Sequence, residues 1–360
     1  MAPWQDIQTQ VDEWLGRAVQ DGICPGYAYA FRIGDAPVQL GAGGRFTYRP
    51  DAPAVTLDTL WDCASLTKVM VTTPLVMHAV AEGWICLTDR VGDIVPESGA
   101  AGATLEQLLT HTSGLPPYRD DLPPRGLSPD ELRAEILATP SVRNPGQEAV
   151  YSCLNFITLQ TILERKSGVA LDEQFHRLIA GSAGMKTGGF RPAVEDICAP
   201  TGPVESWRRE FAIRDGRVIC ELDGGIQGTV HDPLAWGLGG VSGNAGLFAS
   251  IRDLAAWASW WREGGDSWGQ DRMAWTTPRF GTTRGLGWDT RSAIGSIIPE
   301  TWSARSFGHT GFTGMSLFFD PNRSIFVALA TNAIFPEGSN PRTRWVRHLV
   351  HSLVASGSAT

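Results

Sequence analysis

Apolar and polar residues alternate along the chain with two different periods, and each change of period marks a new segment. Residues 1–20 carry apolar side chains at helical spacing together with acidic residues, which predicts an amphipathic helix. Residues 27–34 (YAYAFRIG) alternate large apolar residues with small or polar ones, the pattern of a strand. The run APVQLGAGGRFTY follows across a Gly-Asp turn, so the two runs predict an antiparallel hairpin.

Helical spacing returns after this hairpin. Pro74 falls inside the helical run, which predicts a kink there. Gly83 follows the last periodic residue and is the expected stop. The predicted helix therefore extends from Leu66 to Gly83, and its periodic face consists of Val69, Thr72, Val76 and Val80.

Residues 85–195 have a mainly helical pattern. It is broken by a proline-rich segment, residues 115–131, which we expect to be a long ordered surface loop of the kind that often carries function. Residues 153–168 predict a clear helix that stops at Gly168, with Leu154, Ile157, Thr161 and Ile162 facing inward.

The last third of the chain returns to strand patterns. Residues 196–240 are glycine-rich and predict irregular structure, followed by a helix from about Ile251. Residues 306–332 predict two or three strands with a turn at residues 320–323. A final helix is predicted with Asn340 as its N-cap and Pro341 as its first residue.

This order of elements predicts an α+β fold. An antiparallel sheet flanked by the two terminal helices would form one lobe from residues 1–64 and 200–360. Residues 65–199 would form a large, mainly helical lobe inserted into it. We expect the active site in the cleft between the two lobes.

The composition narrows the function without identifying it. The 360 residues have a formal net charge of −8 and no block of like charges, which argues against a nucleic-acid-binding surface. No apolar run approaches the roughly 20 residues that a membrane span needs, and residues 1–20 lack the features of a secretory signal. Six irregularly spaced cysteines without a CxxC pair predict reduced thiols in a cytoplasmic protein. A secreted form from which a signal had been removed would look the same, so that alternative stays open.

Candidate chemistry begins in the segment WDCASLTKVM. Ser65 precedes Lys68 by three residues, so the two side chains share a helical face. A serine hydroxyl becomes a nucleophile when a base removes its proton, and a lysine is that base only if its pKa falls through burial or a nearby cation. Free N–H groups at a helix start also suit an oxyanion. The motif is short, so it is a hypothesis that its context must support.

Two distant segments supply that context. Tyr151 precedes a predicted helix, where its hydroxyl can relay a proton, and His309-Thr310-Gly311 lies on a predicted strand. In this order the three segments resemble the serine β-lactamase and penicillin-recognising superfamily, in particular its class C branch. Further segments across residues 4–355 are similar to segments of that family, among them PGYAYAFRIG, HTSGLP, SAGMKTGGF, VHDPLAWGLGGVSGNAGLFASIRDLAAWA and GLGW.

The resemblance implies a β-lactamase/DD-peptidase-like fold and a role for each matched residue. Ser65 would be the acylated nucleophile, Lys68 the adjacent base or proton shuttle, and Tyr151 a second general base and acid. The backbone N–H groups of Ser65 and Phe312 would form the oxyanion hole. His309-Thr310-Gly311 would bind the substrate.

Two positions depart from the family's pattern. The second motif is commonly Tyr-x-Asn, but here Cys153 occupies the asparagine position and lacks the amide donor and acceptor. Asn155 lies two residues further along, about half a helical turn away, where it need not substitute for the missing amide; Cys153 and Asn155 are both candidates for contacting the substrate. The third motif is commonly Lys-Thr-Gly, and His309 is a weaker, pH-dependent cation for a substrate carboxylate. Both changes favour esterase-like or peptidase-like members over a dedicated β-lactamase.

We therefore expect a serine hydrolase, without metal or cofactor, that cleaves a small-molecule ester or amide through an acyl-enzyme on Ser65. A carboxylesterase is the first choice. A D-Ala-D-Ala carboxypeptidase or D-aminopeptidase and a weak class C-type β-lactamase are alternatives, and an acyltransferase stays open. A catalytically silent binding protein is a rival from another class, although a silent site has no need of Ser65, Lys68 and Tyr151 together. The sequence gives no oligomeric state.

Other motifs have structural interpretations. The literal Lys-Thr-Gly at residues 186–188 and Ser-x-Asn at residues 242–244 lie outside the expected strand and helix, and we interpret both as structural. His231-Asp232 is expected to shape the cleft rather than to form a triad with Ser65, and His111 to be a hydrogen-bonded loop residue. No HExxH, paired cysteine or acidic cluster offers metal spacing.

Two segments are candidates for the walls of an acyl pocket, namely the loop of residues 117–129 and the tryptophan-rich residues 257–268. Core packing explains the tryptophans equally well. Cys63 and Cys153 are both expected near Ser65, as buried, unreactive thiols rather than as a regulatory pair.

Overall fold

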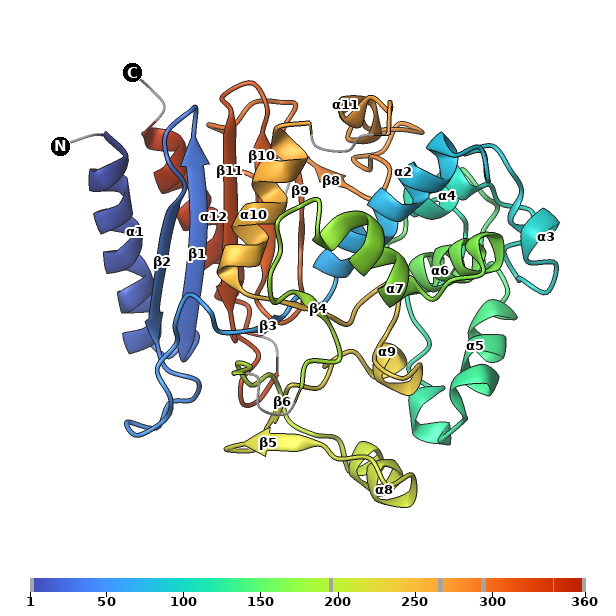
Figure 1. Ribbon diagram of the computed structural model, residues 1–360, viewed down its shortest axis with the longest axis horizontal. Coiled ribbons are helices and arrows are strands. Elements are labelled where there is room, and N and C mark those ends of the chain that lie inside the picture. The colour runs from blue at the N-terminus through green and yellow to red at the C-terminus, as the bar shows by residue number, and fades with distance from the viewer. Residues whose placement is uncertain (1–2, 194–196, 265–267, 293–295, 339, 358–360) are drawn as a thin grey trace.

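An antiparallel sheet forms the centre of the fold (Figure 1). The computed structural model describes residues 3–193, 197–264, 268–292, 296–338 and 340–357. Among these residues, six strands pair in the order β2-β1-β11-β10-β9-β8, so strands from opposite ends of the chain are neighbours at β1 and β11. The strands are Gly26–Ile33 (β1), Gln39–Gly44 (β2), Asp289–Thr290 (β8), Phe307–Thr310 (β9), Ser316–Asp320 (β10) and Ile325–Thr331 (β11).

The two faces of this sheet carry side chains of different size. On β1, the aromatic residues Tyr27, Tyr29 and Phe31 pack with the terminal helices α1 (Pro3–Gln20) and α12 (Thr343–Ser356). Ala28 and Ala30 face the other way, toward α10 (Ile251–Arg262), and their small side chains allow that helix to pack closely on the sheet. The alternation that predicts strand and hairpin is therefore confirmed, as are both terminal helices and the helix at Ile251.

Most of the helices of the middle segment lie on the other side of α10 from α1, on the right in Figure 1. The prediction of helices in residues 85–195 is confirmed for the regular elements that the structure describes there, which are helices apart from the strand Gly189–Phe190, although loops occupy much of this stretch. Residues 194 and 195 lie outside the described part. The helices are η1 (Lys68–Thr72, a π-helical turn), α2 (Thr73–Ala81), α3 (Val91–Ile94), α4 (Leu105–Leu109), η2 (Pro123–Arg125, a 3-10 turn), α5 (Pro129–Leu137), α6 (Cys153–Ser167), α7 (Leu171–Phe175) and η3 (His176–Ala180, a π-helical turn).

Helix ends follow the glycine and proline signals, with one correction. Gly83 and Gly168 have φ values of 70° and 69° beyond the ends of α2 and α6, as a stop in the left-handed conformation requires. Pro74 lies inside a continuous helical stretch, directly after the π-helical turn in which the Thr73 N–H donates to the Lys68 carbonyl. This wider turn accommodates a residue that has no N–H of its own, and the kink at Pro74 stays a prediction. The prediction for the final helix was wrong by two residues, because the Asn340 side chain accepts from the Arg342 N–H in a turn that precedes α12.

Residues 197–240 are less irregular than predicted. They contain α8 (Ser206–Arg214), the β5–β6 hairpin (Cys220–Leu222 and Gly225–Gln227) and α9 (Pro233–Gly237). The pattern does not reveal α8 because its buried residues include the charged Arg208 instead of an apolar stripe. The remaining elements are α11 (Arg272–Trp275) and a small sheet in which β7 (Leu247–Ala249) pairs with β3 (Trp61–Asp62) and β4 (Gly189–Phe190).

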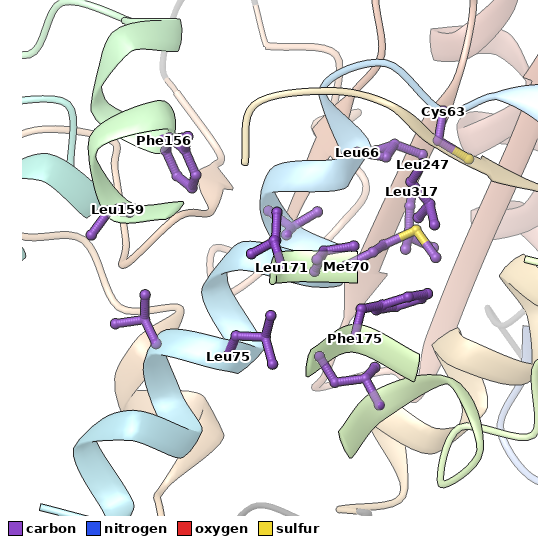
Figure 2. Packing of buried hydrophobic residues seen from close by; sticks show 14 of the residues in the cluster. Cys63, Leu66, Met70, Leu75, Phe156, Leu159, Leu171, Phe175, Leu247 and Leu317 are labelled. Carbon is purple, nitrogen blue, oxygen red and sulfur yellow. The ribbon is translucent and has the colours of Figure 1, made fainter. Parts of the chain in front are cut away.

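One hydrophobic core connects the helices to the sheet. Figure 2 shows Met70, from the helix that follows Ser65, among side chains of α7 and the sheet, with Leu171, Phe175 and Leu317 close by. This packing anchors the helix start at the edge of the sheet. The assignment of residues 65–199 to a separate lobe stays a prediction. None of the described helices has the length and apolar character that crossing a membrane requires.

Candidate active site

Ser65 lies in a strained turn between β3 and η1. Ala64, directly before it, is buried and has a φ of 45°. This left-handed conformation costs a non-glycine residue roughly 1–2 kcal/mol. The Asp62 carboxylate stabilises the turn, because its Oδ1 accepts from the Ala64 N–H at 2.8 Å. The turn exposes Ser65 to a cavity at the start of the helix.

The structure brings Ser65, Lys68 and Tyr151 together. Ser65 Oγ accepts hydrogen bonds from Lys68 Nζ at 2.9 Å and from the Tyr151 hydroxyl at 2.8 Å. Lys68 is fully buried and also donates to the backbone carbonyl of Asn244 at 2.9 Å. Its nitrogen lies 5.0 Å from the centre of the Tyr151 ring. The arrangement places a serine hydroxyl, an amine and a phenol in one contact, which are the groups that activation of a serine nucleophile requires.

The protonation of this cluster favours Tyr151 over Lys68 as the base. Burial lowers the pKa of Lys68. The neighbouring Cys153 and Tyr151 groups raise it, and together these effects leave the pKa of Lys68 above its ordinary value. Burial raises the pKa of Tyr151, and Lys68 opposes that rise. A lysine base needs the opposite shift, so the direction of the Lys68 pKa favours an ammonium at this position.

Cys153 lies beside Lys68, at the position where the Tyr-x-Asn motif of the family has its asparagine. Its sulfur lies 3.6 Å from Lys68 Nζ, at the cavity wall, and burial raises the pKa of the thiol. Asn155 does not replace the missing amide. It is fully buried, accepts from Ser113 at 2.6 Å and contacts His111 at 3.3 Å. Asn155 is not among the described residues that line the cavity, because a position two residues along a helix points to a different side, and its contact with substrate stays a prediction.

His309 is not the cation that the sequence suggests. The side chain is 3% exposed, and its Nδ1 lies 2.7 Å from the Thr310 carbonyl, which makes Nδ1 the protonated nitrogen. Burial, with Lys68 and Arg284 nearby, lowers the pKa of His309 to about 3. It is therefore neutral at physiological pH. The described cavity lining includes the next residues on the chain, Phe312 and Thr313, instead of His309-Thr310-Gly311.

The predicted oxyanion donors face the same cavity. In the described part of the chain, the N–H groups of Ser65 and Phe312 have no hydrogen-bond acceptor. Both residues line the cavity, and Phe312 is 59% exposed. Gly311 lets the strand lie directly on the Ser65 turn, because a Cβ there would be 2.6 Å from the Cys63 carbonyl oxygen. The close approach places the segment that carries Phe312 beside the Ser65 turn.

The cavity has a volume of about 400 Å³ and mainly apolar walls. The loop of residues 117–129 contributes Tyr118 and Asp120, as predicted. The tryptophan-rich segment does not line it: Trp257 and Trp261 stack in the core with ring centres 5.4 Å apart, and residues 265–267 lie outside the described part. The other lining residues are Ala64, Ser65, Tyr151, Cys153, His231, Asp232, Pro233, Ala245, Phe312 and Thr313.

A sequence profile of the Beta-lactamase family matches residues 11–352. The chain belongs to the beta-lactamase family. This membership and the arrangement around Ser65 make it a serine hydrolase. Its α+β fold is the β-lactamase and penicillin-binding-protein fold.

Relatives within and around the beta-lactamase family differ in activity. A putative D-alanyl-D-alanine carboxypeptidase of Salmonella agona (strain SL483) is 26% identical over 315 residues, which cover 80% of this chain and 72% of the relative. The octameric penicillin-binding protein homologue from Pyrococcus abyssi has a TM-score of 0.72 at 19% identity, covering 97% of this chain and 77% of its own.

Two further solved structures share the fold. EstCE1, a hydrolase with promiscuous acyltransferase activity, has a TM-score of 0.75 at 18% identity and covers 96% of this chain and 98% of its own. A class C beta-lactamase from Rhodobacter sphaeroides has a TM-score of 0.70 at 17% identity, with coverage of 96% and 98%. At these identities the likeness shows the fold alone.

Two residues of this beta-lactamase-family site were not predicted. Asn244 belongs to the Ser-x-Asn match interpreted as structural, but its backbone carbonyl holds Lys68, so that interpretation was incomplete. The Arg284 guanidinium lies 5.6 Å from the centre of the Tyr151 ring and pairs with Asp289 at 3.5 Å. Arg284 directly precedes the GLGW segment, which was the available signal.

The remaining motifs are structural, as expected. Lys186 and Thr187 donate backbone N–H groups to Asp253 at the start of α10. His111 is buried, and its Nδ1 accepts from the Ser152 N–H at 3.0 Å. Cys63 is a fully buried free thiol whose side chain lies among core residues in Figure 2. The described residues contain no group of three or more side chains suited to hold a metal ion.

Proposed function

We propose that this protein is a carboxylesterase that cleaves a small-molecule ester through an acyl-enzyme on Ser65. The observation that carries the proposal is the contact of one serine oxygen with both Lys68 Nζ and the Tyr151 hydroxyl. A serine held only for structure has no need of a buried ammonium and a phenol on the same oxygen.

In the acylation step, Ser65 Oγ attacks the ester carbonyl as its proton passes to the Tyr151 oxygen. The Lys68 ammonium stabilises the phenolate that accepts it. Negative charge on the former carbonyl oxygen is stabilised by the N–H groups of Ser65 and Phe312. Collapse of the tetrahedral intermediate breaks the ester C–O bond, and Tyr151 returns the proton to the leaving alcohol.

Deacylation repeats these steps with water. Tyr151 takes a proton from the water, whose oxygen attacks the acyl carbon. The same two N–H groups stabilise the second intermediate. Its collapse releases the carboxylic acid, and the proton returns to Ser65 Oγ.

Two features favour an ester over a β-lactam or a D-alanyl peptide, both of which carry a carboxylate. His309 is neutral, and none of the described residues that line the cavity is a lysine or arginine. Asp120 and Asp232 give the lining negative charge. The described lining therefore offers a substrate carboxylate no cationic side chain of its own, since Lys68 is bound to Ser65 and Asn244 and Arg284 is paired with Asp289, and a neutral ester does not need one.

The experiment compares hydrolysis of p-nitrophenyl butyrate and of a chromogenic cephalosporin, with Ser65→Ala as the blank. We expect ester turnover that disappears in the variant and a slow or absent cephalosporin reaction. Fast cephalosporin turnover, or ester turnover that survives in Ser65→Ala, would refute the proposal. A fluorophosphonate probe that fails to label Ser65 would favour a silent binding protein.

We also propose a cytoplasmic location for the protein and entry of the substrate between two lobes. None of the six cysteines, all of which lie in the described residues, forms a disulfide, which agrees with a reducing compartment and hence the cytoplasm. The substrate would enter between a sheet lobe of residues 1–64 and 200–360 and a helical lobe of residues 65–199.

A further inference from the structure

Asp62 is a fully buried acid that lies beside the site without lining the cavity. Its carboxylate accepts from two backbone N–H groups, that of Ala64 at 2.8 Å and that of His231 at 2.7 Å. Its backbone carbonyl accepts from the Thr313 hydroxyl at 2.7 Å. Ala64, His231 and Thr313 come from three separate segments, and each of them lines the cavity.

These contacts have a specific relation to the oxyanion hole. Ala64 directly precedes Ser65, and Thr313 directly follows Phe312. Each proposed oxyanion donor is thus next in sequence to a residue that is hydrogen-bonded to Asp62. The carboxylate also holds Ala64 in its left-handed conformation, which would otherwise relax and turn the Ser65 N–H away.

The cavity-lining residue His231 is also held by buried polar groups. Asp62 holds the His231 N–H, and the buried Arg208 donates to the His231 carbonyl at 2.8 Å and to that of Val230 at 3.0 Å. The His231 ring in turn stacks on Phe312, with ring centres 5.8 Å apart. Phe312 is therefore constrained through its neighbour Thr313 and through the His231 ring, both of which belong to residues that contact Asp62.

We propose that Asp62 is a positioning residue that fixes the N–H groups of Ser65 and Phe312 relative to each other. The proposal rests on the proposed acyl-enzyme function, because the two groups matter only if they stabilise an oxyanion. Asp62 does not touch the substrate. Its effect appears in the transition state, where donor placement counts, more than in substrate binding.

The ionised carboxylate is the form that holds both N–H groups. Burial raises the pKa of Asp62 to about 6, while the two backbone N–H groups lower it. The charged groups that face it are Asp232, which raises the pKa, and Arg208, which lowers it; Cys63 is a buried neutral thiol. Protonation weakens the acceptor, so the positioning should be lost as the pH falls through about 6.

The test is Asp62→Asn, measured on p-nitrophenyl butyrate between about pH 5 and 8. The asparagine accepts one N–H and presents its own NH₂ to the other. We expect kcat to fall about a hundredfold near pH 8, with KM within about threefold. The deficit should shrink toward pH 5, where the wild-type Asp62 is itself protonated. A merely structural role would give a deficit that does not change with pH.

Controls separate the outcomes. Asp58→Asn, at an exposed ion pair with Arg252, should behave like the wild type. Thr313→Val separately tests the hydrogen bond to the Asp62 backbone carbonyl, which does not depend on the carboxylate, with an expected loss of about tenfold in kcat. A folded Asp62→Asn with wild-type kcat, a pH-independent deficit, or an unaffected Thr313→Val would overturn the positioning role alone. A wild type that neither turns over ester nor labels at Ser65 would overturn the proposed function as well.

Discussion

Lys68 and Cys153 are in contact, with the lysine nitrogen 3.6 Å from the cysteine sulfur. A sulfur is a weak acceptor, so Lys68 obtains its stronger hydrogen bonds from Ser65 and from the Asn244 carbonyl. The place where an asparagine amide would meet a substrate carbonyl is occupied by a group without a good donor. We infer that the site has kept its nucleophile while losing an interaction that amide substrates use.

Restoring the amide should widen the substrate range. In Cys153→Asn the side-chain oxygen can accept from Lys68 and the NH₂ can reach the cavity. One net hydrogen bond of about 1 kcal/mol predicts a gain of roughly fivefold in kcat/KM on a chromogenic cephalosporin. Steady-state kinetics on both substrates measure it. Cys153→Ala is the control and should keep ester hydrolysis within about threefold without the gain; an alanine variant that loses ester turnover would mean that the sulfur is required.

The phenol of Tyr151 should be essential for turnover while its ring is not. Tyr151→Phe keeps the ring against His111, 4.6 Å away, and removes the hydroxyl that contacts Ser65. We expect kcat to fall by about 10²–10⁴-fold with an unchanged melting temperature. Tyr48→Phe removes a phenol that donates to the Gly22 carbonyl on the surface and should have no effect. Equal activity in both variants would rule out Tyr151 as the base.

Activity should rise into the alkaline range. Burial holds the pKa of Tyr151 above its ordinary value despite Lys68. The deprotonated phenol is the base, so its population grows about tenfold for each pH unit below the pKa. The logarithm of kcat/KM on p-nitrophenyl butyrate, corrected for spontaneous hydrolysis, should therefore increase with a slope near one from about pH 7 to 9. A plateau that begins near neutrality would point to a different base.

Local patterns predicted the elements because their signals are local. The alternation on β1 and the glycines after α2 and α6 act through neighbouring residues, and each was found where expected. The order of Ser65, Tyr151 and His309 also predicted which segments meet, and for Ser65 and Tyr151 the side chains touch. Helix α8 was not predicted, because the burial of Arg208 depends on carbonyl partners at residues 230 and 231, outside the helix.

The protonation and the hydrogen-bond partners of the site residues could not be predicted from local patterns. The charge of His309 depends on burial beside Lys68 and Arg284, which are distant in sequence. The Asn244 carbonyl that holds Lys68 is 176 residues away and is a backbone atom, so no side-chain motif marks it. Asn155 has the right residue type at a position that faces His111. Residue identity therefore located the site, and tertiary packing determined its protonation.

Buried neutral histidines should make the fold sensitive to acid. His111, His309 and His351 are at most 3% exposed. Burial lowers their pKa values, to about 3 for His309 and His351. Their folded pKa values lie below the unfolded value of about 6.5, so the unfolded state binds more protons between the two. The stability that these residues contribute is present above about pH 6.5 and is lost as the pH falls.

His351 allows a test outside the active site, because it packs in the core between Trp302 and Phe318. Between about pH 6.5 and 5 one such histidine costs about 2 kcal/mol of unfolding free energy. His351→Phe should therefore lose about 2 kcal/mol less than the wild type over this range in urea titrations. From about pH 7.5 to 9 the two proteins should change in parallel, since the histidine is neutral in both states. Parallel curves over the acid range as well would show that His351 does not contribute to the acid sensitivity.

The raised pKa of Asp62 acts on stability in the opposite direction, because this group takes up its proton first in the folded state. Acid should thus reduce activity through Asp62 while the histidines reduce stability.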